Sequence, residues 1–323
     1  MSDINIEKIL QGNRRALAKA ITLIESKLDQ HREQAQALLE TVLPHTGKSI
    51  RIGITGIPGV GKSTFIEAFG QLLIQHGKHV AVLAVDPTSP VTGGSIMGDK
   101  TRMEQLSQME NAFIRPSPSS GSLGGVAQKT RETMLLCEAA GYDVVIVETV
   151  GVGQSEYEVA SMVDFFLVLM LPNAGDELQG IKKGILELAD AIVVNKADGD
   201  SVDMARRTQQ HYRNAFHILQ HNGFWQPQVL TCSALESKRI DALWEMMLEY
   251  QTKAIAANKF EEKRALQNRE WMWKLVHEII DIKLNADPGT ANLRKTTESQ
   301  VVNGDMTPYS AAKTLTQSLF KNQ

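Results

Sequence analysis

The segment GIPGVGKST, at positions 56–64, constrains the fold of this 323-residue chain more than any other part of the sequence. It matches the pattern G-x-x-x-x-G-K-[ST] in full, and it lies between the β-branched run IRIGITG and a stretch with helical apolar spacing. A strand before the motif and a helix after it are the context that a phosphate-binding loop requires. The motif therefore predicts a strand, a phosphate loop and a helix in direct succession.

The residue types of this loop suit a nucleoside triphosphate. Its glycines let the backbone turn tightly, so that its N–H groups and the N-terminus of the next helix form a cradle for an anion. Lys62 supplies a catalytic cation for the β- and γ-phosphates, Ser63 supplies a hydroxyl for Mg²⁺, and Thr64 supports the α-phosphate side. The expected phosphate-site residues are Gly56, Ile57, Pro58, Gly59, Val60, Gly61, Lys62, Ser63 and Thr64.

Further apolar runs alternate with helical segments downstream of the phosphate loop. Most of these runs are apolar on successive residues, which is typical of strands buried on both faces of a sheet. The alternation indicates βαβ crossovers, and the predicted fold is an α/β, doubly wound and mainly parallel sheet. The expected strands lie at 79–86, 142–150, 164–171, 190–198 and 227–234.

Both ends of the chain show helical patterns. In the tail, a long helix with one apolar stripe is expected over 258–284, a break at Pro288, and a second helix over 308–320. Composition leaves open whether this tail packs on its own domain or mediates dimerisation. The expected domains are a helical N-terminal extension (1–47), a P-loop nucleotide-binding domain (48–256) and a helical C-terminal dimerisation arm (257–323).

A second motif, NKAD at 195–198, ends one of the expected strands and favours guanine over adenine. The carboxylate of Asp198 can accept hydrogen bonds from the N1–H and the 2-amino group of guanine, whereas adenine would present a lone pair to it. Lys196 can lie along the base, and Asn195 can tie neighbouring loops together. Downstream, a backbone N–H of the triplet Ser233, Ala234 and Leu235 can meet the guanine O6.

Three acidic residues are candidates for a magnesium and switch region with a catalytic role. Asp86 and Glu148 end expected strands, which open onto the nucleotide crevice of a doubly wound sheet, and Asp99 follows a Gly-rich loop. Together with Ser63 they supply the oxygen ligands that Mg²⁺ prefers. No residue is evident that orients the attacking water, so we expect slow GTP hydrolysis that a partner accelerates.

Composition excludes several other classes. The formal net charge of -3 does not favour a nucleic-acid partner. Two distant cysteines, Cys137 and Cys232, predict neither a disulfide framework nor a metal cluster. The N-terminus lacks a signal-peptide pattern, and the longest apolar run is too short to span a bilayer, so a cytoplasmic protein without a membrane partner is expected.

Four long blocks, together with the phosphate loop and NKAD, make the chain resemble the MeaB/ArgK family of P-loop GTPases, which includes the methylmalonic aciduria type A proteins. The resemblance covers nearly the whole chain. The blocks are DPTSPVTGGSIMGDKTRM (86–103), RPSPSSGSLGG (115–125), VETVGVGQSE (147–156) and LPNAGDELQGIKKG (171–184).

The resemblance implies a homodimeric G-protein that binds an adenosylcobalamin-dependent methylmalonyl-CoA mutase or a related acyl-CoA mutase. Family members gate cofactor loading and protect the mutase, and the mutase stimulates their GTP hydrolysis. By motif, the resemblance assigns phosphate and Mg²⁺ roles to Lys62 and Ser63, and a Mg²⁺ or switch role to Asp86, Asp99 and Glu148. The segment 171–184 is similar to an additional switch that couples the nucleotide state to the partner.

Three alternatives stay open at this point. A nickel-insertion GTPase would need Cys or His ligands near the switches, and the middle of the chain offers only Cys137. A kinase or ATPase linked to amino-acid transport would prefer ATP, against the guanine pattern of NKAD. A scaffold with a vestigial phosphate loop would not need the intact Lys62, Ser63 and Asp86.

Overall fold

The computed structural model describes residues 4–26, 28–85, 103–116, 123–149, 155–172, 183–218, 223–286 and 288–321. The chain divides into two compact units, Met1–Glu261 and Glu262–Gln323.

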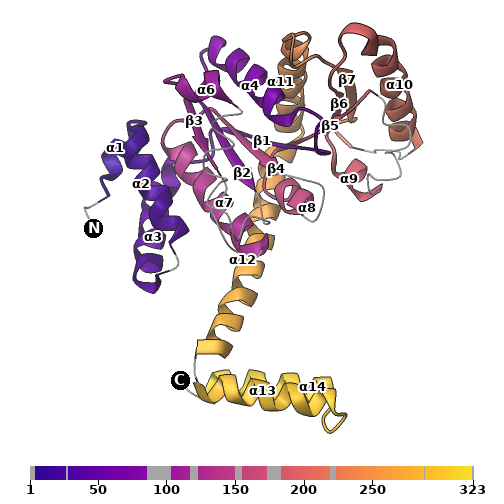
Figure 1. Cartoon of the computed structure of the whole chain (residues 1–323). Coiled ribbons are helices and arrows are strands. Elements are labelled where there is room, and N and C mark those ends of the chain that lie inside the picture. Colours follow the sequence, from indigo (N-terminus) through magenta and orange to yellow (C-terminus); the bar gives the residue numbers. More distant parts are fainter. Residues whose placement is uncertain are drawn as a thin grey trace. The chain divides into compact units, whose positions relative to one another are not determined.

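A seven-stranded sheet forms the centre of the first unit, in the order β3-β2-β4-β1-β5-β6-β7 (Figure 1). Every neighbouring pair is parallel within the described strands. After β1 the chain builds one half of the sheet through β2, β3 and β4, and then the other half through β5, β6 and β7, as a doubly wound sheet does. The strands are β1 (Ile50–Gly56), β2 (Val80–Val85), β3 (Ala112–Arg115), β4 (Val144–Thr149), β5 (Phe165–Met170), β6 (Ala191–Val194) and β7 (Gln228–Thr231).

Helices cover both faces of this sheet, so nearly all strand residues are buried. Alternate strand residues point to opposite faces. On one face, Ile52 and Ile54 of β1 belong to a core with α4 (Lys62–Gln75) and α11 (Ile240–Ala256). On the other face, Val145 and Val147 of β4 belong to a core with α2 (Arg14–Glu25) and α7 (Leu123–Ala139). The other α-helices described in this unit are α1 (Ile6–Leu10), α3 (Asp29–Val42), α6 (Glu104–Gln108), α8 (Ser155–Ala160), α9 (Lys183–Leu188) and α10 (Val202–Ile218).

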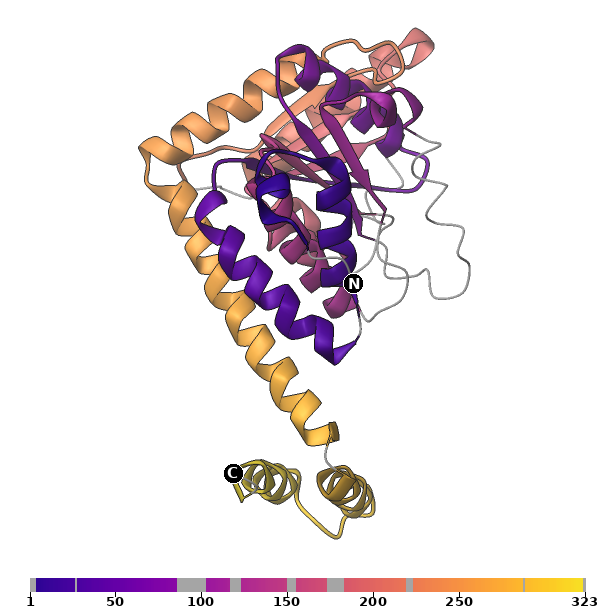
Figure 2. The same cartoon turned by 90° about the vertical axis from the view of Figure 1, so that its left-hand side faces the viewer.

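The N-terminal helices α1, α2 and α3 pack beside α7 and belong to the first unit (Figures 1 and 2). Asn13 caps α2 through its side-chain oxygen, which accepts from the N–H groups of Arg15 and Ala16 at 3.1 and 3.0 Å. The apolar stripe of α2, with Leu17, Ile21 and Ile24 fully or nearly fully buried, faces the core. The expected helical extension is confirmed as a set of helices on the sheet domain.

The second unit consists of the remainder of α12 (Lys259–Ala286) followed by α13 (Pro288–Val302) and α14 (Pro308–Lys321), of which α13 and α14 pack on each other. The long helix α12 ends before Pro288, as expected, but Pro288 also opens α13, a helix that was not predicted. Proline suits the first position of a helix, where its missing N–H would have no intrahelical acceptor.

One strand was not predicted. The short strand β3 pairs with β2 at the sheet edge, with Val80 opposite Ala112, so Glu148 lies on the fourth strand of the chain. Its apolar run, Ala112 to Ile114, has only three residues between polar neighbours, which is too short to mark a strand in sequence.

Candidate functional site

The phosphate loop connects β1 to α4 at the carboxyl edge of the sheet, as its sequence predicts. Gly59 and Gly61 have φ angles of +79° and +92°, a region that glycine enters without a steric penalty. A Cβ on Gly56 would lie 2.6 Å from the carbonyl oxygen of Leu169, so the loop also needs glycine where it passes β5. Gly61 precedes α4, and no side chain caps that helix N-terminus. The loop therefore offers an uncapped helix N-terminus to an anion.

Lys62 is buried at the start of α4, and its ammonium group lies inside the loop. Its Nζ donates to the carbonyl oxygens of Gly56 at 2.6 Å and Ile57 at 3.3 Å. The ammonium therefore holds the two ends of the loop together, and its charge lies where phosphate oxygens would enter. Ser63 is half-buried and Thr64 exposed on the first turn of the same helix.

The NKAD segment contacts the phosphate loop directly. Nδ2 of Asn195 donates to the carbonyl oxygen of Val60 at 2.9 Å, and Nζ of Lys196 donates to that of Gly59 at 2.8 Å. Asn195 follows β6 and its own backbone N–H bonds to Met170 of β5, so parallel strands deliver both loops to one edge of the sheet. The structure thus joins the two segments that the sequence analysis assigned to phosphate and base.

The segment after β7 completes the same cluster. The hydroxyl of Ser233 donates to Oδ2 of Asp198 at 2.5 Å, and the N–H of Ala234 donates to Oδ1 of Asn195 at 3.0 Å. Among the described residues, the N–H of Leu235 has no acceptor, whereas those of Glu236 and Ser237 are bonded within the turn. The N–H of Leu235 is therefore a free donor beside the half-buried carboxylate of Asp198.

Glu148 lies next to the strand that leads into the phosphate loop. It is buried on β4, opposite Ile54 of β1 and Ala84 of β2 in the parallel register. One residue on, the hydroxyl of Thr149 donates to that of Thr55 at 2.7 Å, which links β4 and β1 just before Gly56. This threonine pair was not predicted, because its only signal in the sequence is two polar residues at the ends of apolar runs.

Several predicted residues lie outside the described parts of the chain. These include Asp86 and Asp99, the loop 87–98, and the central residues of the blocks 115–125, 147–156 and 171–184. Within the described residues, no group of three or more His, Cys, Asp or Glu side chains could hold a metal ion.

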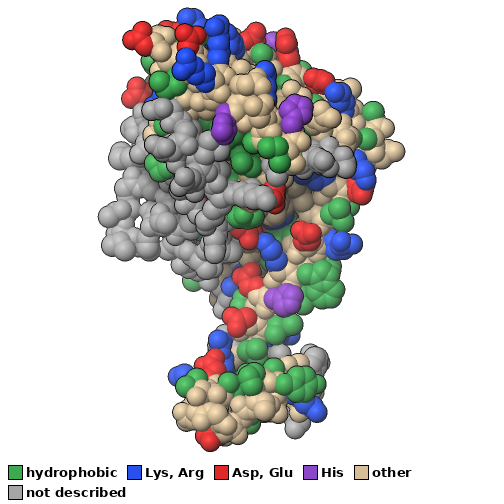
Figure 3. Space-filling view, turned by 90° about the vertical axis from the view of Figure 1, so that its right-hand side faces the viewer, with side chains coloured by type: hydrophobic (Ala, Val, Ile, Leu, Met, Phe, Trp, Pro, Cys, Tyr) green, Lys and Arg blue, Asp and Glu red, His purple; other side chains and the backbone are tan. Residues whose placement is uncertain are grey.

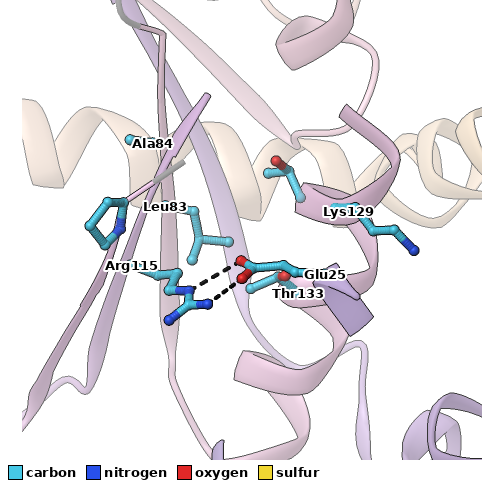
Figure 4. Close-up of a pocket in the computed structure, with 8 residues that line it drawn as sticks. Glu25, Leu83, Ala84, Arg115, Lys129 and Thr133 are labelled. Carbon is cyan, nitrogen blue, oxygen red and sulfur yellow. Dashed lines mark hydrogen bonds and ion pairs between the residues drawn. The ribbon is translucent and has the colours of Figure 1, made fainter. Parts of the chain in front are cut away.

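A small pocket lies elsewhere at this edge, where β2 and β3 end near α2 and α7 (Figure 4). The guanidinium of Arg115 forms an ion pair with the carboxylate of Glu25, and Lys129 and Thr133 of α7 also line the pocket. Its accessible volume of about 10 Å³ holds about one water molecule, which excludes a nucleotide. Its ion pair fixes α2 to the end of β3.

Figure 3 shows one face of the molecule, on which acidic and basic side chains are interspersed. In the described part of the chain, no helix is long and apolar enough to cross a membrane.

Comparison with known proteins identifies the family. The family model described as "Methylmalonyl Co-A mutase-associated GTPase MeaB" matches residues 17–288. The GTPase ArgK of Escherichia coli (strain K12) is 50% identical over 314 residues, which is 97% of this chain and 95% of that protein. The mitochondrial methylmalonic aciduria type A homolog of Mus musculus is 45% identical over 326 residues, which is 98% of this chain and 78% of that protein.

A solved structure agrees in fold as well as in sequence. The crystal structure described as an LAO/AO transport system kinase has a TM-score of 0.77 and 43% sequence identity, covering 97% of this chain and 96% of that one. These matches confirm the α/β P-loop fold and the family resemblance inferred from the motifs. The chain belongs to the MeaB family of methylmalonyl-CoA mutase-associated GTPases.

Proposed function

We propose that the chain binds GTP with Mg²⁺ at the carboxyl edge of its sheet, and that it acts as a gate for an adenosylcobalamin-dependent acyl-CoA mutase. The observation that supports this most is the hydrogen bond from Asn195 to Val60, which joins the base segment to the phosphate loop across 135 residues of sequence. A phosphate loop that no longer binds nucleotide would not need a direct hydrogen bond to the base-reading segment.

The phosphate end of the site depends on Lys62 and the N-terminus of α4. Incoming phosphate oxygens would replace the carbonyl oxygens of Gly56 and Ile57 as partners of the ammonium. Nucleotide binding would therefore break the two hydrogen bonds by which Lys62 now holds the start of the loop. Charge that develops on the phosphates during hydrolysis is stabilised by this cation and by backbone N–H groups.

The residues near the loop fit a magnesium ion. The hydroxyl of Ser63 and the carboxylate of Glu148 are hard oxygen donors, and a site with few protein ligands suits Mg²⁺, which keeps several waters and phosphate oxygens. We assign Ser63, Glu148, Asp86 and Asp99 to hold it directly or through water. When bound, the ion neutralises phosphate charge.

The base end reads guanine through one carboxylate and one backbone donor. Asp198 accepts from N1–H and the 2-amino group, while the hydroxyl of Ser233 already orients its Oδ2. The free N–H of Leu235 suits the O6 oxygen, since the N–H of Ala234 is already donated to Asn195.

The partner follows from the family. The family model is described as a methylmalonyl-CoA mutase-associated GTPase, and the sequence offers no evident residue that orients the attacking water, so slow hydrolysis that rises on mutase binding is the expected behaviour. The block 171–184, between β5 and α9, is our candidate for the segment that reports the nucleotide state to the mutase. We further propose that the functional form is a homodimer.

An exchange of base specificity tests the guanine site and the partner together. Asp198→Asn replaces the acceptor of N1–H with an amide that can pair with the 2-oxo group of xanthine. We expect GTP turnover to fall at least about tenfold and XTP turnover to rise, since a lost charge-assisted hydrogen bond is worth about 1.5–3 kcal/mol. The measurement is phosphate release from GTP, XTP and ATP, with and without methylmalonyl-CoA mutase.

Asp200→Asn is the matched control, because Asp200 is an exposed aspartate two residues downstream and outside the motif. Unchanged GTP turnover in Asp198→Asn would reject the base assignment. Absence of stimulation by any cobalamin-dependent mutase would reject the partner while leaving the GTPase intact. Faster turnover of ATP than of GTP by the wild type would instead favour the kinase alternative, which the description of one solved relative also names.

A further inference from the structure

The side-chain amide of Asn195 has its hydrogen bonds divided between two loops. It is only 2% exposed, and its Nδ2 donates to the carbonyl oxygen of Val60 while its Oδ1 accepts from the N–H of Ala234 at 3.0 Å. An amide oxygen accepts two hydrogen bonds, and a flipped amide would face the N–H of Ala234 with another donor. The contact with the phosphate loop therefore depends on what holds Oδ1.

The thiol of Cys232 lies against the remaining acceptor position of that oxygen. Its Sγ is 3.5 Å from Oδ1 of Asn195. The backbone of Cys232 is held on both sides: its N–H donates to Val194 and its carbonyl oxygen accepts from Ala197, each at 2.9 Å. The residue is also fully buried, so water does not compete with Asn195 for its thiol.

The thiol can act only as a donor in this position. Burial, and then the charge of Asp198, raise the pKa of Cys232 to about 12, so the sulfur keeps its proton at neutral pH. A protonated thiol is a weak donor, and within the described part of the chain its sulfur bonds only to the amide oxygen of Asn195.

We propose that Cys232 is a positioning residue for guanine-nucleotide binding: its S–H donates the second hydrogen bond to Oδ1 of Asn195 and so aims Nδ2 at the phosphate loop. This inference rests on the guanine site proposed above, and it identifies the group that orients the side chain of Asn195 in that site. Cys232 itself touches neither base nor phosphate and acts through Asn195. In sequence it looks like one more small core residue of an apolar strand.

A matched pair of variants separates the donor from the volume. Cys232→Thr and Cys232→Val place side chains of the same shape at the end of β7, but only threonine carries a donor. We expect Cys232→Thr to bind GDP within about twofold of the wild type and Cys232→Val to bind it about threefold to tenfold more weakly, as loss of one modest hydrogen bond predicts. The measurement is titration calorimetry of the full chain with GDP at neutral pH.

Two controls exclude a merely structural effect. Cys137→Thr and Cys137→Val make the same changes at a cysteine buried in α7, where we expect equal GDP affinities. In an Asn195→Ala background, the difference in GDP affinity between the two Cys232 variants should disappear, because residue 232 affects the nucleotide only through the side chain of Asn195. The thermal midpoint of each variant without nucleotide is measured alongside, since a purely structural role would change that midpoint and leave GDP affinity equal.

The outcomes distinguish this inference from the proposed site. Equal GDP affinity of Cys232→Thr and Cys232→Val overturns the role of the thiol, while wild-type GDP binding leaves the guanine site standing. A difference that persists without Asn195 also overturns it. Failure of the wild type to prefer GDP over ADP would overturn both the guanine site and this inference.

Discussion

Gly61 is a position at which the phosphate loop passes close to the base segment. Its φ of +92° favours glycine, and an added Cβ would lie 2.9 Å from Nδ2 of Asn195. That nitrogen is the donor to Val60, so a methyl group here would compete with the contact on which the proposed site depends. The glycine is needed for two independent reasons, backbone conformation and lack of space.

Gly61→Ala should therefore weaken GDP binding at least about tenfold and also lower stability by about 1–2 kcal/mol, the usual cost of a left-handed alanine. Gly77→Ala is the control on the same helix. Gly77 follows α4 with a φ of +74° and has nothing within 4 Å of an added Cβ, so it carries the strain without the clash. Calorimetric GDP titrations and urea unfolding of both variants are compared. Equal loss of GDP affinity would show that strain alone matters.

At this scale, the sequence predicted where the loops of the proposed site lie better than it predicted their contacts. Asn195 and Val60 could be placed at one edge because both follow strands of a parallel sheet. Their hydrogen bond, the hydroxyl pair of Thr55 and Thr149, and the thiol contact of Cys232 could not be predicted. Each depends on side-chain distances of a few ångström, and residue type and spacing do not encode those.

Among the elements, one buried ion pair connects the sheet to two helical layers. Nε of Arg51, at the start of β1, donates to Oε1 of Glu138 on α7 at 2.6 Å, and the side chain of Glu138 is fully buried. The other carboxylate oxygen accepts from the N–H of Gly47, where the N-terminal helices end, at 2.8 Å. One carboxylate thus holds β1, α7 and the N-terminal extension together.

Removing that carboxylate should be costly. We expect Glu138→Gln to lower the free energy of unfolding by about 3–5 kcal/mol, because it leaves the buried guanidinium without its counter-charge. The double variant Arg51→Met/Glu138→Leu should recover much of this loss, since no charge then remains buried. Glu249→Gln, which breaks an exposed pair with Lys253 on α11, should cost less than about 1 kcal/mol. Urea denaturation followed by far-UV circular dichroism measures all three; similar costs for Glu138→Gln and Glu249→Gln would contradict the assignment.

The elements that sequence analysis found are those with strong periodicity. The longer strands and the N-terminal helices were predicted, because apolar runs and helical spacing persist over enough residues. Strand β3 was missed because its apolar run, AFI, has only three residues between polar neighbours, and α13 was missed because Pro288 and Gly289 resemble a break. Pairing with β2 makes the first of these segments a strand, and packing against α14 stabilises the second as a helix.

The whole molecule has large apolar side chains exposed on its second unit (Figure 3). On α12, Trp273 is 55% and Ile279 53% exposed, and on α14 Tyr309 is 80% exposed. Groups of exposed large apolar side chains on one small unit commonly mark a protein–protein interface. This observation supports the proposed homodimer, and we propose residues 262–323 as its contact surface.

A charge on this surface should therefore separate the chains. We expect the wild type to have twice the 35.6 kDa mass of one chain in multi-angle light scattering, and Ile279→Asp to have the mass of a single chain, because dimerisation would bury an unpaired carboxylate. Ile255→Asp is the matched control, since Ile255 is 56% exposed on α11 of the first unit and its substitution should leave the dimer intact.

Because the proposed nucleotide-binding residues all lie in the first unit, Ile279→Asp should keep wild-type GDP affinity, so that loss of the dimer is separable from loss of the site. A wild type that already has the mass of one chain, or an Ile279→Asp variant that retains twice that mass, would rule out this surface as the dimer contact.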